Sequence, residues 1–160
     1  MNNSILRFST FICLFVIFVV GISCNKNETD VFKNDVRVKS GIKITGSEQV
    51  PVVNTAGEGR LDVSYDPVTK VLNYNIRWEI MTSGVVGIHF HGPAARGANA
   101  GVIHDINITD YIGSTNGMAT GKVTLNNTTL KEIDLLSGFW YINIHTVNNR
   151  NGESRAQIIF

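Results

Sequence analysis

Hydrophobic and polar residues alternate along most of the chain from Val36 onward, with the period of two that is typical of β-strands. In 58–66 (EGRLDVSYD) and 70–80 (KVLNYNIRWEI), most apolar side chains fall on one face of each segment. Pro67 lies in the short connection between them, where it favours a β-turn. The two segments therefore predict a β-hairpin.

The same alternation continues to the end of the chain, with one interruption. Further strands are predicted at 36–46, 85–91, 102–108, 117–126, 139–146 and 154–160. Between them, Thr129 and Glu132 have the spacing of a capping box, and Gly138 stands where a short helix would stop. Seven or eight short strands with one helix predict an all-β domain, an antiparallel Greek-key sandwich or barrel.

The first residues have the pattern of an export signal. One basic residue, Arg7, precedes the apolar run FICLFVIFVVGIS, which is shorter than the about 20 residues that span a bilayer. Small residues then precede Cys24, and this segment resembles the lipobox of bacterial lipoproteins, although Gly21 stands where leucine is usual. We therefore expect a signal peptide at 1–23, a lipid on Cys24, a polar tether at 24–35 and one β domain at 36–160.

Cysteine and charge content narrow the possible partners. Cys13 would leave with the signal peptide and Cys24 would be acylated, so no cysteine remains for a disulfide. Removing Arg7 from the 14 basic residues leaves 13, which equals the number of acidic residues. A neutral domain without a basic run argues against nucleic acid as a partner.

Three of the four histidines have the same strand parity. In VVGIHFH, His89 and His91 lie opposite Ile88 and Phe90, and in FWYINIHT the residue His145 lies opposite the apolar set. Residues two apart on a strand are about 6.6 Å from each other, and neighbouring strands are about 4.8 Å apart. If the two strands are adjacent, their imidazoles can converge on one copper or zinc ion.

Other roles for these histidines stay open. Their nitrogens could instead bond to carbonyl groups of the Gly-rich loop GPAARGANAG at 92–101, or contact a ligand or partner directly. His104 shares parity with Ile106 and Ile108, so it is predicted to point toward the core or to begin its strand. We interpret His104 as structural.

Three separated motifs resemble the CHRD domain, a family named for its occurrence in chordin and common in bacterial exported proteins. They are GSEQVPVV, HFHGPAARG and YINIHTVNNRNGESRAQI, and the resemblance runs from about Lys43 to Phe160. The matching positions are Glu48, Val50, Pro51, His89, His91, Gly92, Pro93, Ala94, Asn143, His145, Thr146, Gly152, Glu153, Arg155 and Gln157. Ala156 stands where glycine is usual. The resemblance implies an antiparallel β fold and no established reaction.

A fainter likeness links the His-x-His strand and the late histidine to copper/zinc superoxide dismutases. The cysteine pair and the zinc-binding cluster of those enzymes have no counterpart here. Arg155 lies two residues from Glu153 on the same strand face, a spacing that predicts a structural ion pair rather than a catalytic arginine. Dismutase activity is therefore disfavoured, whereas copper or zinc binding stays open.

Together these patterns predict an exported protein of the cell envelope, anchored to a bacterial membrane through Cys24. Its domain is expected to act as a non-enzymatic binding or interaction module for an unidentified protein or small ligand. The alternative is a copper or zinc protein with a three-histidine site and superoxide-dismutase-like redox activity. The residues predicted to form the functional surface are His89, His91, His145, Asn143, Arg155 and the loop 92–101, with Gly92 and Pro93 beginning that loop and Glu153 supporting Arg155.

Overall fold

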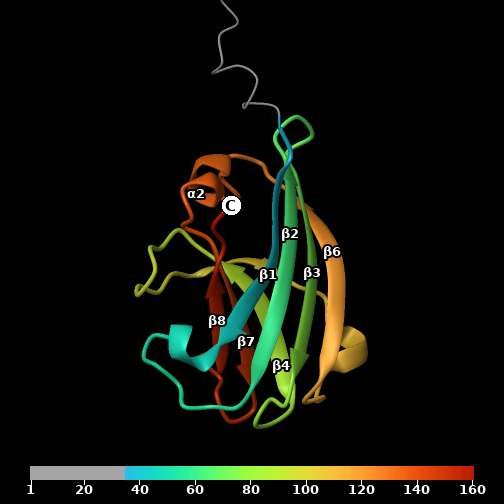
Figure 1. Cartoon of the computed structure of the whole chain (residues 1–160), viewed down its shortest axis with the longest axis vertical. Coiled ribbons are helices and arrows are strands. Elements are labelled where there is room, and N and C mark those ends of the chain that lie inside the picture. The colour runs from blue at the N-terminus through green and yellow to red at the C-terminus, as the bar shows by residue number, and fades with distance from the viewer. Residues whose placement is uncertain (1–34) are drawn as a thin grey trace, which may run out of the picture.

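The computed structural model describes residues 35–160, and the predicted signal peptide and Cys24 lie outside that range. Eight strands form one curled antiparallel sheet in the order β5-β4-β7-β8-β1-β2-β3-β6 (Figure 1). The strands are β1 (Arg37–Thr45), β2 (Glu58–Asp66), β3 (Val71–Glu79), β4 (Val85–His91), β5 (Val102–Asp105), β6 (Gly117–Thr124), β7 (Tyr141–Thr146) and β8 (Ser154–Gln157). The all-β prediction is confirmed.

Short helical segments lie in the connections. They are η1 (Gly46–Glu48), η2 (Thr109–Tyr111) and α2 (Glu132–Leu136), the first two being 3₁₀ turns. No helix in 35–160 is long and apolar enough to cross a membrane.

The predicted hairpin is confirmed, because β2 and β3 pair without a break from Asp66 opposite Val71 to Glu58 opposite Glu79. The sheet then curls so that its two halves face each other. β1 and β8 share a single pair, Thr45 with Arg155. The rings of Tyr74 on β3 and Phe90 on β4 lie nearly perpendicular to each other across the core, with centroids 5.3 Å apart. The apolar face of each half is therefore buried against the other half.

The helix prediction was partly wrong. α2 begins at Glu132. The side chain of its N-cap residue, Lys131, makes no capping hydrogen bond, and the Glu132 backbone N–H donates to Asn127 Oδ1 at 3.1 Å. The Glu132 carboxylate instead accepts hydrogen bonds from the Tyr65 hydroxyl at 2.8 Å and from Lys70 at 2.7 Å, so Thr129 and Glu132 form no capping box. Tertiary partners on β2 and on the β2–β3 turn thus outcompete the local cap. Gly138, with φ of 73°, follows the helix as predicted.

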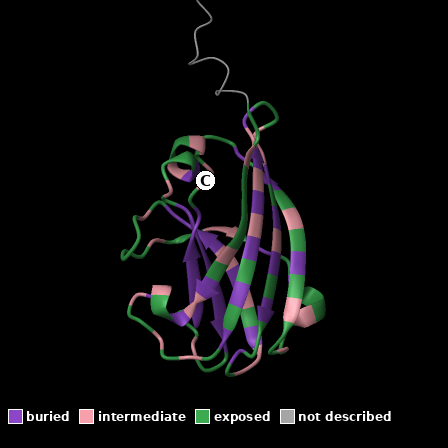
Figure 2. Cartoon of the chain, in the orientation of Figure 1, coloured by how far each residue is buried: buried purple, intermediate pink, exposed green. Residues whose placement is uncertain are grey.

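Strands β7 and β8 differ from the others because every residue in both is buried (Figure 2). Their inner face carries the apolar residues Ile142, Ile144 and Ala156. Their outer face carries polar side chains, including Asn143 and Arg155, and the loops cover it. The domain therefore buries a second, polar layer outside its apolar core.

Glu153 holds the loops at one end of this layer. Its carboxylate is fully buried and accepts hydrogen bonds from the hydroxyls of Thr55, Thr82 and Thr146, from the Thr82 backbone N–H, and from the Asn149 amide, at 2.6 to 3.3 Å. Burial alone would raise the pKa of Glu153, but hydrogen bonds, chiefly those from Thr55, Thr82 and Thr146, hold this pKa below its usual value. The charged carboxylate therefore stabilises the fold.

Replacing this carboxylate should destabilise the domain in a pH-dependent way. We expect Glu153→Gln to lower the free energy of unfolding at pH 7 by about 2–4 kcal/mol. The substitution replaces one carboxylate oxygen, which accepts hydrogen bonds, by an NH₂ group that faces other hydrogen-bond donors. The benefit of the carboxylate is complete above its unfolded pKa of about 4.3 and is lost as pH falls through the lower folded pKa. Urea unfolding followed by circular dichroism should therefore give a smaller difference at pH 3 than at pH 7.

The control is Glu79→Gln, which changes an exposed carboxylate on β3. It should alter the free energy of unfolding by about 0.5 kcal/mol or less. Equal effects of the two substitutions at pH 7 would contradict the role given to Glu153.

Candidate metal centre

Antiparallel pairing of β4 with β7 brings the predicted residues together. Because side chains alternate, every second pair in this register projects from the outer face. These pairs are His91 with Tyr141, His89 with Asn143, and Gly87 with His145. On the far side of β7, Asn143 also pairs with Arg155 of β8. The strand with His89 and His91 is therefore adjacent to the strand with His145, as a three-histidine site requires.

The three histidine rings form a compact cluster. Their ring centroids are 4.7 Å apart for His89 and His145, and 5.7 Å apart for the other two pairs. One ring nitrogen from each residue lies within 4.8 Å of those from the other two. Within residues 35–160, this is the one group of three or more metal-ligating side chains that are so close together.

In each ring, one nitrogen contacts an oxygen atom of the protein. The Nδ1–H of His91 donates to the Ala100 carbonyl at 3.0 Å, and that of His145 donates to the Arg150 carbonyl at 2.8 Å. His89 places Nε2 3.3 Å from the carboxylate of Asp105, its partner in β5. These contacts assign the tautomers of His91 and His145 and orient all three rings.

The other nitrogen of each ring has no hydrogen-bond partner. Among the described residues, five buried side-chain polar atoms lack one, and three of them belong to this cluster. They are Nδ1 of His89, Nε2 of His91 and Nε2 of His145. A buried polar atom without a partner costs free energy, about 1–3 kcal/mol each, so three in one place call for a ligand.

All three imidazoles favour the neutral form. Burial lowers the pKa of His89, His91 and His145, and the neighbouring His145 lowers the pKa of His89 further. Asp105 acts in the opposite direction on His89, as the Ala100 and Arg150 carbonyls do on His91 and His145, without reversing the shifts. Neutral rings keep the lone pair that binding to a metal requires.

Tyr141 and Arg155 support the cluster from β7 and β8. The ring of Tyr141 is parallel to His91 within 10°, with centroids 4.9 Å apart, and the Arg155 guanidinium carbon lies 3.5 Å from the centroid of Tyr141. The Tyr141 hydroxyl accepts from the Ala100 N–H at 2.9 Å and lies 3.0 Å from the Ala100 carbonyl, to which it donates. These contacts hold the loop 92–101 over His91.

The ion pair predicted between Glu153 and Arg155 was wrong. Arg155 donates instead to Asn99 at 3.2 Å and to Gln157 at 3.1 Å, and it forms no ion pair with any residue in 35–160. Residues two apart on a short strand share a face only if both belong to the ladder, and Glu153 precedes β8. Its carboxylate therefore points to the threonine hydroxyls described above.

Asn143 lies beside the histidines but is tied to the loops. Its Oδ1 accepts a hydrogen bond from Gln49, and its Nδ2 donates to the Asn151 carbonyl at 3.4 Å. Gly152 passes so close that a Cβ on it would lie 2.2 Å from Asn143 Oδ1, and its φ is 115°. Glycine is therefore required here for both space and conformation.

The predicted functional surface is covered rather than open. Exposed fractions are 7% for His91, 5% for Asn143, 9% for His145 and 1% for Arg155. Gly92 begins the covering loop: it is buried, and a Cβ on it would lie 3.0 Å from the Phe139 carbonyl. Pro93, next in the chain, is exposed.

Some contributors were not predicted from the sequence. Asp105, Tyr141 and Gln49 all touch the cluster or its frame, as do two main-chain carbonyls. Asp105 had a recognisable signal, because it alternates with His104 and so belongs to the outer face. His104 points inward as predicted, with its ring 6.1 Å from that of Phe90 and 6.3 Å from that of Tyr74.

Comparison with known families agrees with this arrangement of motifs. The model of the CHRD domain matches residues 41–158. The chain belongs to the CHRD family. No curated protein and no solved structure matches it. In this CHRD domain, the His-x-His motif of His89 and His91 on β4 lies beside His145 on the neighbouring strand β7.

Substituting Gly152 should disturb the frame around Asn143. We expect Gly152→Ala to lower the free energy of unfolding by more than about 2 kcal/mol, because positive-φ strain of about 1–2 kcal/mol is added to a collision. Gly97→Ala is the matched control: its φ is 85°, but nothing lies within 4 Å of the added Cβ. Urea unfolding of both variants separates the cost of backbone strain, which both share, from the cost of the steric collision, which only Gly152→Ala has. Equal losses of unfolding free energy in the two variants would contradict a collision at Gly152.

Proposed function

We propose that this CHRD-domain protein binds one copper or zinc ion through His89, His91 and His145, as a lipid-anchored, non-enzymatic module of the bacterial cell envelope. Two observations carry the metal proposal: one ring nitrogen from each of the three histidines lies within 4.8 Å of those from the other two, and each ring has a buried nitrogen without a hydrogen-bond partner. The other nitrogen of His91 and of His145 donates a hydrogen bond to a main-chain carbonyl, and that of His89 lies near the Asp105 carboxylate. Histidine ligands of metals have this outer-shell arrangement.

The spacing of the nitrogens suits an ion after a small adjustment. Nitrogens bound tetrahedrally at about 2.0–2.1 Å from one ion are about 3.3 Å apart, whereas here one ring nitrogen from each histidine lies within 4.8 Å of those from the other two. The His89 ring has the most freedom to close this difference, because a quarter of its side chain is exposed and its Asp105 partner is 85% exposed. His91 and His145 are already held by their carbonyl contacts.

Ligand chemistry selects the class of metal. Three imidazoles suit zinc and copper, whereas magnesium and calcium prefer oxygen ligands. For a given set of nitrogen ligands, Cu²⁺ binds more tightly than Zn²⁺. The domain should therefore take either ion and prefer copper when both are supplied.

A partner-binding surface made of the same residues is less well supported. His91, Asn143, His145 and Arg155 are buried, so a protein partner could reach them only if the loops opened. If the carbonyl contacts of His91 and His145 served only to hold the loops, the second nitrogen of each of these two rings would be unexplained. A metal ion accounts for both nitrogens.

Metal binding by the full chain tests this proposal. In detergent-solubilised protein, titration calorimetry and elemental analysis should give one Cu²⁺ or Zn²⁺ per chain, with a Kd below about 1 μM. The double substitution His89→Ala/His145→Ala should abolish binding while circular dichroism shows a folded β domain. Metal at 100 times its Kd should add about 2.7 kcal/mol to the stability of the wild type.

The matched control is His104→Phe, which removes the fourth histidine but keeps an aromatic ring against Phe90. It should bind metal as the wild type does. Absence of tight binding in the wild type, or retention of binding in the folded double variant, would overturn the proposal.

The membrane anchor is proposed from the sequence around Cys24, which lies outside the described residues. An apolar run ending in small residues and a cysteine, followed by a polar tether, is what supports it. In bacteria that express the chain, Cys24→Ser should abolish incorporation of labelled fatty acid and release the protein from the membrane fraction. Cys13→Ser should change neither, and lipid labelling of the Cys24→Ser chain would contradict the assignment.

A further inference from the structure

Arg155 is a buried cation without a carboxylate partner. It is 1% exposed, and its hydrogen-bond and ring partners are the neutral groups Asn99, Gln157 and the ring of Tyr141. β7 lies between β4 and β8, so the Tyr141 ring separates the guanidinium from His91 by one aromatic layer. An unpaired buried charge is costly, and an opposite charge nearby would relieve that cost.

A divalent ion on the three histidines would add to this positive charge. The imidazoles are neutral ligands, so they leave the charge of the ion uncompensated. The nearby carboxylates are mainly engaged elsewhere: Asp105 is largely in solvent beside His89, Glu153 lies among its hydroxyl donors, and Glu48, whose charge favours protonated Arg155, is ion-paired with Arg96. The centre therefore has excess positive charge in a mostly buried setting.

The cluster also offers only part of a coordination shell. No fourth histidine, cysteine, aspartate or glutamate joins the three within the described part of the chain. Zinc sites with three protein ligands keep a fourth position for an exogenous ligand. His91 and His145 are buried, whereas the His89 side chain is 25% exposed, so the approach from solvent is on the side of His89.

We propose that this fourth position takes a small monovalent anion and that the charge of Arg155, acting through the Tyr141–His91 stack, strengthens its binding. The inference rests on the proposed metal site and adds the chemical class of its exogenous ligand. Arg155 is a positioning and electrostatic residue here, because it touches Tyr141 rather than the ion. The anion would add negative charge to a centre whose three ligands are neutral and whose neighbouring carboxylate Glu48 is already ion-paired with Arg96.

Azide binding to the copper-loaded full chain tests this. After elemental analysis has shown one Cu²⁺ per chain, azide is titrated while the copper–azide charge-transfer absorption and the electron paramagnetic resonance spectrum are recorded. The wild type should show saturable binding. Arg155→Gln should weaken azide binding by about four- to fifteenfold, as expected for one charge acting over roughly 10 Å at an effective dielectric constant of about 20–40. Arg155→Lys should keep most of the affinity.

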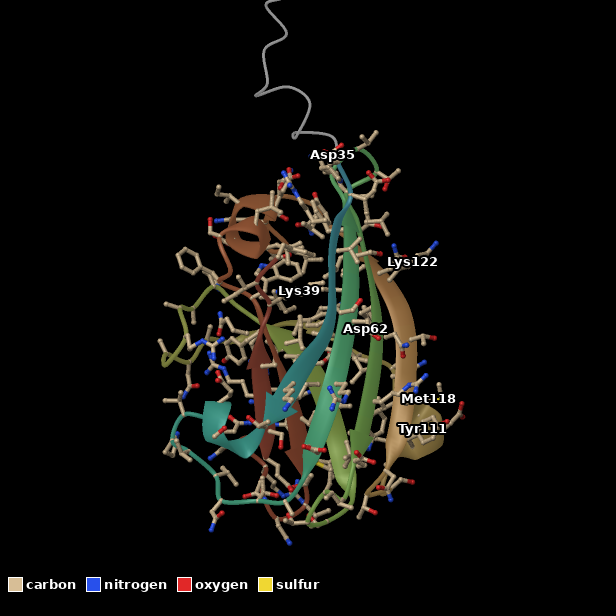
Figure 3. All side chains as sticks on the ribbon, in the orientation of Figure 1. Asp35, Lys39, Asp62, Tyr111, Met118 and Lys122 are labelled. Atoms are coloured by element: carbon tan, nitrogen blue, oxygen red, sulfur yellow. The ribbon has the colours of Figure 1, made fainter. Side chains whose placement is uncertain are left out.

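The charge control is Lys122→Gln, on β6, at the opposite edge of the sheet from β5 (Figure 3). It removes one exposed positive charge and should leave azide binding unchanged. Stoichiometric copper without any azide response would overturn the inference and leave the metal site standing. Equal azide affinity in Arg155→Gln and the wild type would overturn it too, and failure to load copper would remove both proposals.

If Arg155→Gln does not fold, Arg155→Met takes its place, because it removes the charge and keeps an unbranched side chain against the Tyr141 ring. It should weaken azide binding to the same extent in the copper-loaded chain. Wild-type azide affinity in a folded, copper-loaded Arg155→Met chain would overturn the role of the charge.

Discussion

The register between β4 and β7 is the constraint on which the site depends. A shift of one residue would move His89 and His91 to the apolar face and bring Ile88 and Phe90 out. Such a shift is opposed by the burial of Ile88, Phe90, Ile142 and Ile144, all of which are 0% exposed. The apolar core thus fixes the position of the polar cluster on the other face of the same strands.

The outer face of β7 and β8 shows how a polar layer can be buried at acceptable cost. Asn143 and Glu153 find hydrogen-bond partners in the loops, and Arg155 and Tyr141 form a cation–π contact that also places the loop 92–101. The exceptions are the three ring nitrogens of the histidine cluster. Where nearly all other polar groups are satisfied, these exceptions mark the place where function is expected.

Much of this arrangement could be predicted from the sequence because strand periodicity carries it. Alternation assigned His89, His91 and His145 to one face and His104 to the other, and the structure agrees. The pattern could not show that loops would cover this face, since burial of a polar face depends on loop paths that no period encodes. For the same reason the partners of Glu153 and Glu132 were missed: both carboxylates bond to residues distant in sequence, where local spacing has no information.

The carbonyl contacts of His91 and His145 have a consequence for motion. Each ring is bound by Nδ1 to a different loop, through Ala100 in one and Arg150 in the other. Neither ring can turn without breaking its hydrogen bond to the main-chain carbonyl of its loop. Whatever occupies the free nitrogens is therefore thermodynamically linked to the order of both loops. Ligand capture and loop closure form a single equilibrium, so the backbone amides of these loops are natural reporters of occupancy.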